Sequence, residues 1–247
     1  MALNSHKDGL GPKRKYWGQY FLKNKSIAKK IVEAAGVNKD DVVLEVGPGK
    51  GALTEILLQK AKKVIAVEKD KKLADFLMDK FKDNKNLEIV HYDILKFFPK
   101  TPIGTTCLRS YESGTISLGL KKSYKLKKSY KLKKPYKIVA NIPYYITSRF
   151  LRKFLESDCQ PSLMALMVQK EVAERIISRN GKESLLSISV KSYGQPKIIA
   201  KVPAENFSPV PKVDSAIILI DNISKDFFKK NKIKETELKL LDYIINF

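Results

Sequence analysis

Apolar residues recur along most of the chain with two alternating periods. Short runs rich in Val, Ile and Leu predict strands, at residues 42–46, 64–68, 87–90, 138–140 and 163–168. Segments with apolar positions three and four apart predict helices, one carrying Leu53, Ile56, Leu57 and Leu58 and others at 71–81, 147–155 and 170–178. This alternation predicts an α/β fold, with a mostly parallel sheet covered by helices on both faces.

The pattern changes after residue 184. Residues 186–190, 197–202 and 215–220 are predicted to be strands with no long helix between them, and so to form an antiparallel end of the same sheet. We expect one domain over residues 1–220. In residues 221–247, apolar side chains at helical spacing predict a short helical tail: Leu238, Leu241, Ile244 and Ile245.

One segment, at about residues 101–136, interrupts the pattern. It contains a tandem repeat, Lys-Lys-Ser-Tyr-Lys-Leu from Lys121 and again from Lys127, then Lys-Lys-Pro-Tyr-Lys-Ile from Lys133. Residues 121–137 hold nine lysines and no acidic residue. The composition favours a solvated, low-complexity insertion. The alternative is a basic arm whose tyrosines stack on single-stranded nucleic acid.

The net charge of +22 favours a polyanion as the partner, the alternative being a lysine-rich, well-solvated surface. No apolar stretch approaches the roughly 18 residues of a membrane span, and no signal peptide is recognisable, so we expect a cytoplasmic protein that does not associate with membranes. Two separate cysteines, Cys107 and Cys159, and two histidines, His6 and His91, predict no disulfide framework, no metal site and no histidine-dependent hydrolase.

A glycine-rich turn follows the first predicted strand. Gly47, Gly49 and Gly51 let the backbone approach a ligand closely, and the helix that follows directs its amide groups toward an anionic or polar group. The turn is not a Walker A loop, because Gly51 stands where that loop has Ser or Thr.

Acidic residues stand at the ends of the first three strands, namely Glu45, Glu68 and Asp93. Glu68 lies about 20 residues past the turn, where a carboxylate can bind both hydroxyls of a ribose. We expect Asp93 to accept a hydrogen bond from an adenine amino group, with a helix N-cap as the alternative role. Together the three acids predict a site for an adenosine moiety.

The fourth strand runs directly into Asn141-Ile142-Pro143-Tyr144. The exocyclic amine of a purine is a poor nucleophile, because its lone pair is delocalised into the ring. Hydrogen bonds to the Asn141 side-chain oxygen and the Ile142 carbonyl would favour a pyramidal nitrogen. Pro143 fixes the turn, and Tyr144 offers a ring on which the base can stack.

Five blocks of the sequence occur together in a characteristic order: residues 14–22, 45–51, 141–146, 169–175 and 206–215. With these blocks the sequence resembles the KsgA family, the ribosomal RNA adenine N6 dimethyltransferases. The resemblance implies a Rossmann-like class I methyltransferase domain that uses S-adenosylmethionine. It also implies action on two adjacent adenines near the 3′ end of small-subunit ribosomal RNA during ribosome assembly, and we expect a monomer.

The resemblance also implies roles for individual residues. The implied cofactor-binding residues are Tyr20, Leu22, Gly47, Gly49, Glu68, Asp93 and Asn141. The implied catalytic residues are Asn141, Ile142, Pro143, Tyr144 and Phe207. Phe207 would stack on the target base opposite Tyr144, with plain core packing as its alternative. Position 20 departs from the family, which more often has Asn or His there, so we expect a backbone contact to the cofactor from Tyr20.

Three other functions remain open from the sequence. One is methylation of a single adenine of large-subunit RNA, as in macrolide resistance, against which the 169–175 block and Val213-Asp214-Ser215 argue. Another is a non-catalytic ribosome-assembly factor, which the shortened tail favours and the intact site residues oppose. The third is a nicotinamide oxidoreductase, which would leave Asn141–Tyr144 unexplained.

Overall fold

The computed structural model describes residues 19–97, 135–178 and 183–232. The predicted insertion up to Lys134 and the apolar positions from Leu238 onward lie outside these residues. Within them, the tail after residue 221 contains one short helix, α7 (Asp226–Asn231). No helix in the described ranges is both long and apolar enough to cross a membrane.

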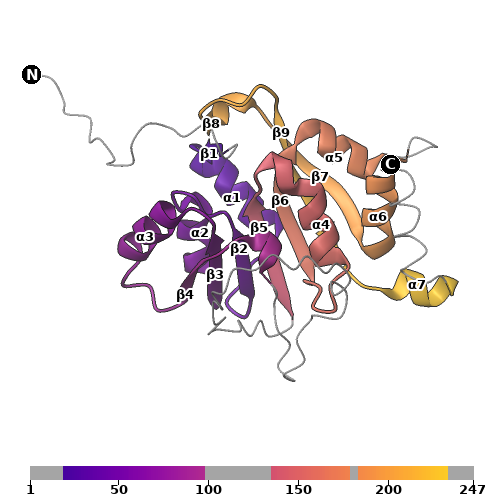
Figure 1. The fold of residues 1–247 in the computed structure, drawn as a ribbon, viewed down its shortest axis with the longest axis horizontal. Helices are drawn as coiled ribbons and strands as arrows, with labels where there is room; N and C mark the ends of the chain where they lie inside the picture. The colour runs from indigo at the N-terminus through magenta and orange to yellow at the C-terminus, as the bar shows by residue number, and fades with distance from the viewer. Residues whose placement is uncertain (1–18, 98–134, 179–182, 233–247) are drawn as a thin grey trace, which may run out of the picture.

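The core of the fold is an α/β arrangement around one large sheet (Figure 1). In the described residues seven strands pair in the order β4-β3-β2-β5-β6-β9-β7, and a small antiparallel pair, β1-β8, stands apart. The first five strands of the large sheet are parallel, β9 pairs antiparallel with β6, and β7 pairs antiparallel with β9. The strands are β1 (Phe21–Leu22), β2 (Val42–Val46), β3 (Lys63–Glu68), β4 (Leu87–His91), β5 (Tyr136–Asn141), β6 (Leu163–Gln169), β7 (Gln195–Val202), β8 (Phe207–Ser208) and β9 (Ser215–Asp221). The predicted mostly parallel sheet with an antiparallel end is confirmed.

Helices cover both faces of the sheet, as the alternating strand residues require. In β2, Val43 packs on the side of α1 and α2, and Leu44 and Val46 pack on the side of α4, α5 and α6. The longer helices are α1 (Lys25–Ala34), α2 (Ala52–Lys60), α3 (Lys71–Lys80), α4 (Thr147–Leu155), α5 (Lys170–Ile177) and α6 (Leu185–Tyr193). Short 3-10 turns lie between other elements: η2 (Ile94–Lys96), η3 (Tyr144–Ile146) and η4 (Ala204–Asn206).

The prediction of a strand at residues 186–190 is wrong, because this segment lies within helix α6. Its apolar residues alternate with serines, which imitates a strand pattern, but Ser187 is part of the buried face. Ser187 is fully buried and donates a hydrogen bond to the Ile176 carbonyl of α5, at 2.9 Å. Ser184 caps the helix by accepting from the Ser187 amide.

The C-terminal bound of the predicted insertion also needs correction. Tyr136, in the last copy of the repeat, is the first residue of β5 and is almost completely buried, and its hydroxyl donates to the Cys159 carbonyl at 2.6 Å. Lys137 forms an ion pair with Asp41 at 2.9 Å. The repeat therefore runs directly into the central sheet, and the insertion ends before Tyr136.

Candidate active site

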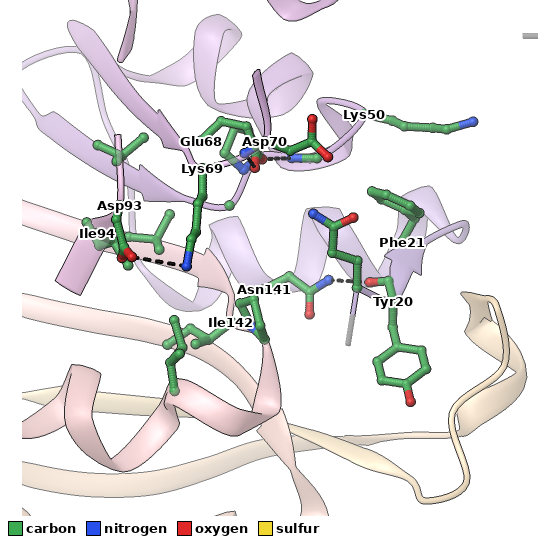
Figure 2. A pocket seen from close by; sticks show the side chains of 18 of the residues that line it. Tyr20, Phe21, Lys50, Glu68, Lys69, Asp70, Asp93, Ile94, Asn141 and Ile142 are labelled. Atoms are coloured by element: carbon green, nitrogen blue, oxygen red, sulfur yellow. Dashed lines mark hydrogen bonds and ion pairs between the residues drawn. The ribbon is translucent and has the colours of Figure 1, made fainter. Parts of the chain in front are cut away.

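The carboxyl ends of four neighbouring parallel strands open onto one cavity of about 530 Å³. β2 leads into the glycine turn, and β3, β4 and β5 end beside Glu68, Asp93 and Asn141. Figure 2 shows these three side chains around the cavity, with Tyr20 closing one side. The cavity lies where open parallel sheets bind ligands, outside the carboxyl ends of the strands.

The glycine turn has a backbone that other residues rarely adopt. Gly47 and Gly49 have φ of +61° and +59°. A Cβ on Gly49 would also lie 3.0 Å from the ring of Phe21, which lines the cavity. Both positions therefore require glycine, and the turn presents bare backbone to the cavity.

Glu68 is held by the backbone on two sides. Its Oε2 accepts from the Gly49 amide at 3.1 Å and its Oε1 accepts from the Asp70 amide at 2.9 Å. Burial raises the pKa of Glu68 although these amides favour the charged form. These two hydrogen bonds fix the Glu68 carboxylate in place. Because each carboxylate oxygen can accept more than one hydrogen bond, Glu68 can still bind a ligand hydroxyl.

Asp93 performs the helix-cap role that the sequence left open. It accepts from the Leu95 amide at 2.9 Å at the start of η2, and it pairs with Lys69 at 3.1 Å (Figure 2). Burial opposes the charged form, but the Leu95 amide and Lys69 outweigh it and lower the pKa of Asp93. Lys69 lines the cavity and was not predicted, because its contact depends on the pairing of β3 with β4.

Glu45 does not belong to the cavity, contrary to its grouping with the other two acids. It is fully buried, and its Oε2 accepts from the Thr54 hydroxyl at 2.8 Å. The N-cap of α2 is Gly51, which has no side chain, so Glu45 caps this helix from β2 through Thr54. Burial, with a smaller contribution from the charge of Glu68, raises the pKa of Glu45 to about 8. The hydrogen bonds from Thr54 act in the opposite direction. Its Oε1 contacts no hydrogen-bond partner among the described residues.

The Asn141 amide has a defined orientation. Its Nδ2 donates to the Tyr20 carbonyl at 3.0 Å, and a carbonyl can only accept, so the side-chain oxygen occupies the other side (Figure 2). Ile142 and Pro143 follow it along the cavity wall. The Tyr144 hydroxyl is 2.7 Å from Ser215 Oγ, which anchors the ring. This segment therefore presents an acceptor and an aromatic face to the same cavity.

Phe207, like Glu45, is a predicted site residue that the structure places outside the cavity. Its ring is fully buried in the core formed by α1, α2 and one face of the sheet, and it pairs with Leu22 between β8 and β1. In this structure no base can stack on it, so the alternative of plain core packing is correct. The other predicted residues all line the cavity: Tyr20, Leu22, Gly47, Gly49, Glu68, Asp93, Asn141, Ile142, Pro143 and Tyr144.

Comparison with known proteins gives a consistent picture. The sequence family described as "Ribosomal RNA adenine dimethylase" matches residues 11–242. The chain is 43% identical over 225 residues to "Ribosomal RNA small subunit methyltransferase A" of Dehalococcoides mccartyi strain CBDB1, covering 87% of this chain and 68% of the relative. The chain thus spans about two thirds of that relative.

Two solved structures share the fold over most of the chain. A dimethyladenosine transferase from Plasmodium falciparum is 29% identical with a TM-score of 0.64, covering 84% of this chain and 65% of that one. The 23S rRNA methyltransferase ErmE is 26% identical with a TM-score of 0.66, covering 92% of this chain and 77% of that one.

Proposed function

The chain belongs to the ribosomal RNA adenine dimethylase family, and we propose that its cavity transfers methyl groups from S-adenosylmethionine to adenines near the 3′ end of small-subunit ribosomal RNA. Membership makes the chain an enzyme, a methyltransferase of ribosomal RNA adenines. The small subunit is favoured by the curated relative, which is named for it. The single observation that carries the proposal is the oriented Asn141 amide beside Tyr144 in the wall of the cavity of about 530 Å³.

The residues present fit the cofactor. Gly47 and Gly49 line the cavity with main chain in a positive-φ conformation and carry no side chain, which suits a ligand in close contact with the chain. Glu68 is positioned to accept from the ribose hydroxyls, and Asp93 to accept from the adenine amino group once it shares or releases Lys69. When bound, S-adenosylmethionine supplies the methyl group.

The protein's own contribution is to prepare the target nitrogen. A base that leaves its stack and enters the cavity finds the Tyr144 ring and the Asn141 side-chain oxygen. Hydrogen bonds from the amine to that oxygen and to the Ile142 carbonyl withdraw the lone pair from the ring. These bonds strengthen as positive charge develops on nitrogen, so they stabilise the transition state more than the ground state.

Substitution of Asn141 tests this proposal. Asn141→Ala should lower turnover on assembling small subunits by roughly 10²–10³-fold, the scale for loss of one preorganised polar contact. Affinity for RNA should change little, because basic surface residues carry most of it. The measurement is single-turnover methyl transfer, with mass spectrometry of small- and large-subunit RNA to locate the product.

A matched control is Asn86→Ala. The Asn86 amide also donates to a backbone carbonyl, that of Leu58 at 3.1 Å, but it does not line the cavity. This variant should keep wild-type turnover. Wild-type turnover in Asn141→Ala would make the segment a simple strand-end turn, and tight binding of a dinucleotide without binding of S-adenosylmethionine would exclude the proposed cofactor.

A further inference from the structure

Tyr20 contacts both residues that the proposed function places beside the target base. Its carbonyl accepts from the Asn141 amide at 3.0 Å. Its ring stacks on the Tyr144 ring, with centroids 5.3 Å apart and planes inclined by 30°. All three residues line the cavity.

The stacking distance leaves no room for a base between the two rings. Aromatic carbon atoms in contact lie about 3.5–4.0 Å apart, so a base inserted between two rings requires a separation of about 7 Å. The Tyr20 ring therefore blocks one face of the Tyr144 ring. A base that is to stack on this face must first displace Tyr20.

Displacement of the ring leaves the catalytic geometry intact. The Tyr20 side chain is only half-buried, and it turns about its own Cα–Cβ bond without moving the main chain. The carbonyl that orients Asn141 is a main-chain group and stays in place. One residue thus has two separable roles, one in its backbone and one in its ring.

We propose that the Tyr20 ring is a specificity-determining element that holds the stacking face of Tyr144 until the target base displaces it. This inference rests on the proposed function, which supplies the base. The incoming base must replace the contact between the two tyrosine rings. The fused rings of a purine offer a larger stacking area than the phenol ring, and the single ring of a pyrimidine does not. Competition with Tyr20 therefore favours adenine over pyrimidines before the base forms a hydrogen bond with Asn141.

Kinetics on assembling small subunits at saturating S-adenosylmethionine test the displacement. An aromatic pair is worth enough to shift an equilibrium roughly 2–10-fold. Tyr20→Ala should lower the half-saturating concentration of subunits by about that factor, because the incoming base no longer has to displace a ring. Tyr20→Phe keeps the ring and should restore the wild-type value.

The matched control removes a ring from another aromatic pair. Phe227 on α7 contacts Phe228 edge-on at 5.4 Å and is 42% exposed, and it does not line the cavity. Phe227→Ala should leave the half-saturating concentration unchanged. Thermal unfolding of each variant shows whether it is folded. An unchanged or raised half-saturating concentration in a folded Tyr20→Ala protein would overturn the proposal, the raised value indicating that Tyr20 adds a layer to the stack.

A second measurement does not require methyl transfer. Short single-stranded RNAs carry one adenine, as the purine probe, or one uracil, as the pyrimidine probe, and each displaces an RNA whose 2-aminopurine emission reports stacking. The wild type should bind the purine probe more tightly, and Tyr20→Ala should narrow this preference by about 2–10-fold. An unchanged preference would overturn the inference even where the wild type methylates normally. If the wild type does not methylate RNA but Tyr20→Ala still narrows the preference for the purine probe, the proposed reaction is rejected and the role of Tyr20 is retained.

Discussion

Single residues in this fold owe their roles to neighbours that are distant in sequence. Asn141, Glu68 and Asp93 were predicted from strand ends alone, because parallel strands bring their carboxyl ends to one edge. Their contacts with Tyr20, Gly49 and Lys69 were not predictable, since each depends on how strands and loops pack. An aromatic residue in a turn-rich segment likewise does not show its depth, which is why Phe207 was assigned to the site.

The raised pKa of Glu45 predicts how the free energy of unfolding depends on pH. Its pKa in the folded protein is about 8, above the ordinary value of 4.5 in the unfolded chain. The folded state therefore binds the proton more tightly, and this contribution to stability is complete below about pH 4.5 and is lost as pH rises through about 8. The loss is at most about 1.4 kcal/mol per pH unit in this interval.

Glu45→Gln keeps the shape and the acceptor for Thr54 but does not titrate. Chemical denaturation of both proteins between pH 5 and pH 8, read as the difference in unfolding free energy, measures the effect. The glutamine variant should gain stability relative to the wild type as pH rises. A difference that stays constant with pH would show that Glu45 is ionised in the folded protein.

Whole elements were predicted well where one face is clearly apolar, and poorly where small polar residues pack. β2, β3 and β4 are β-branched runs between turns, and they form within one residue of the expected ranges. Helix α6 was mistaken for a strand because Ser187 belongs to its buried face and donates to α5. Helix α1 was not predicted, although the Asn24 cap and the spacing of Ala28, Ile31 and Val32 are signals for it.

The start of α2 gives an element-scale prediction. Gly51 has φ of +85°, and a Cβ there would lie 2.7 Å from the Phe81 ring and 3.1 Å from Leu77. Gly36 has φ of +53°, but a Cβ there would meet open space, with no atom of the described residues within 4 Å. Gly36→Ala therefore measures backbone strain alone, about 1–2 kcal/mol.

Gly51→Ala adds steric overlap to the same strain. Overpacking typically costs about 1–3 kcal/mol more, so this variant should unfold at a clearly lower urea concentration than Gly36→Ala. It should also weaken cofactor binding, because the turn from Gly47 to Gly51 joins β2 to α2. Equal losses in the two variants would mean that Phe81 and Leu77 move aside without cost.

At the scale of the whole molecule, the apolar pattern and the net charge determine different properties. The fold of the described residues depends on two apolar clusters on either side of the sheet. The net charge of +22, to which the lysine-rich repeat contributes, predicts a polyanionic partner and does not specify the architecture. The sequence therefore predicted the class of partner from composition and the fold from periodicity, as independent results.

Deletion of residues 121–134 tests this separation. The deletion removes eight lysines but ends before Tyr136 and Lys137, whose contacts with Cys159 and Asp41 fix β5. All the removed residues lie outside the described ranges, and the two apolar clusters of the described residues stay complete, so we expect the melting temperature to change by no more than a few degrees. Affinity for RNA should fall. Because each lost phosphate contact removes about 0.7–0.9 from the slope of log affinity against log salt concentration, the salt dependence should become shallower.

Extending the deletion to residue 137 provides the contrast. This variant loses the Tyr136 hydroxyl bond and the Lys137–Asp41 ion pair as well as the start of a central strand, and it should be destabilised severely. Binding titrations at several salt concentrations measure the salt dependence of RNA affinity, and thermal melts of both variants measure the melting temperature. A large drop in melting temperature for the shorter deletion would show that the repeat is packed structure, and an unchanged salt slope would show that its lysines do not contact RNA.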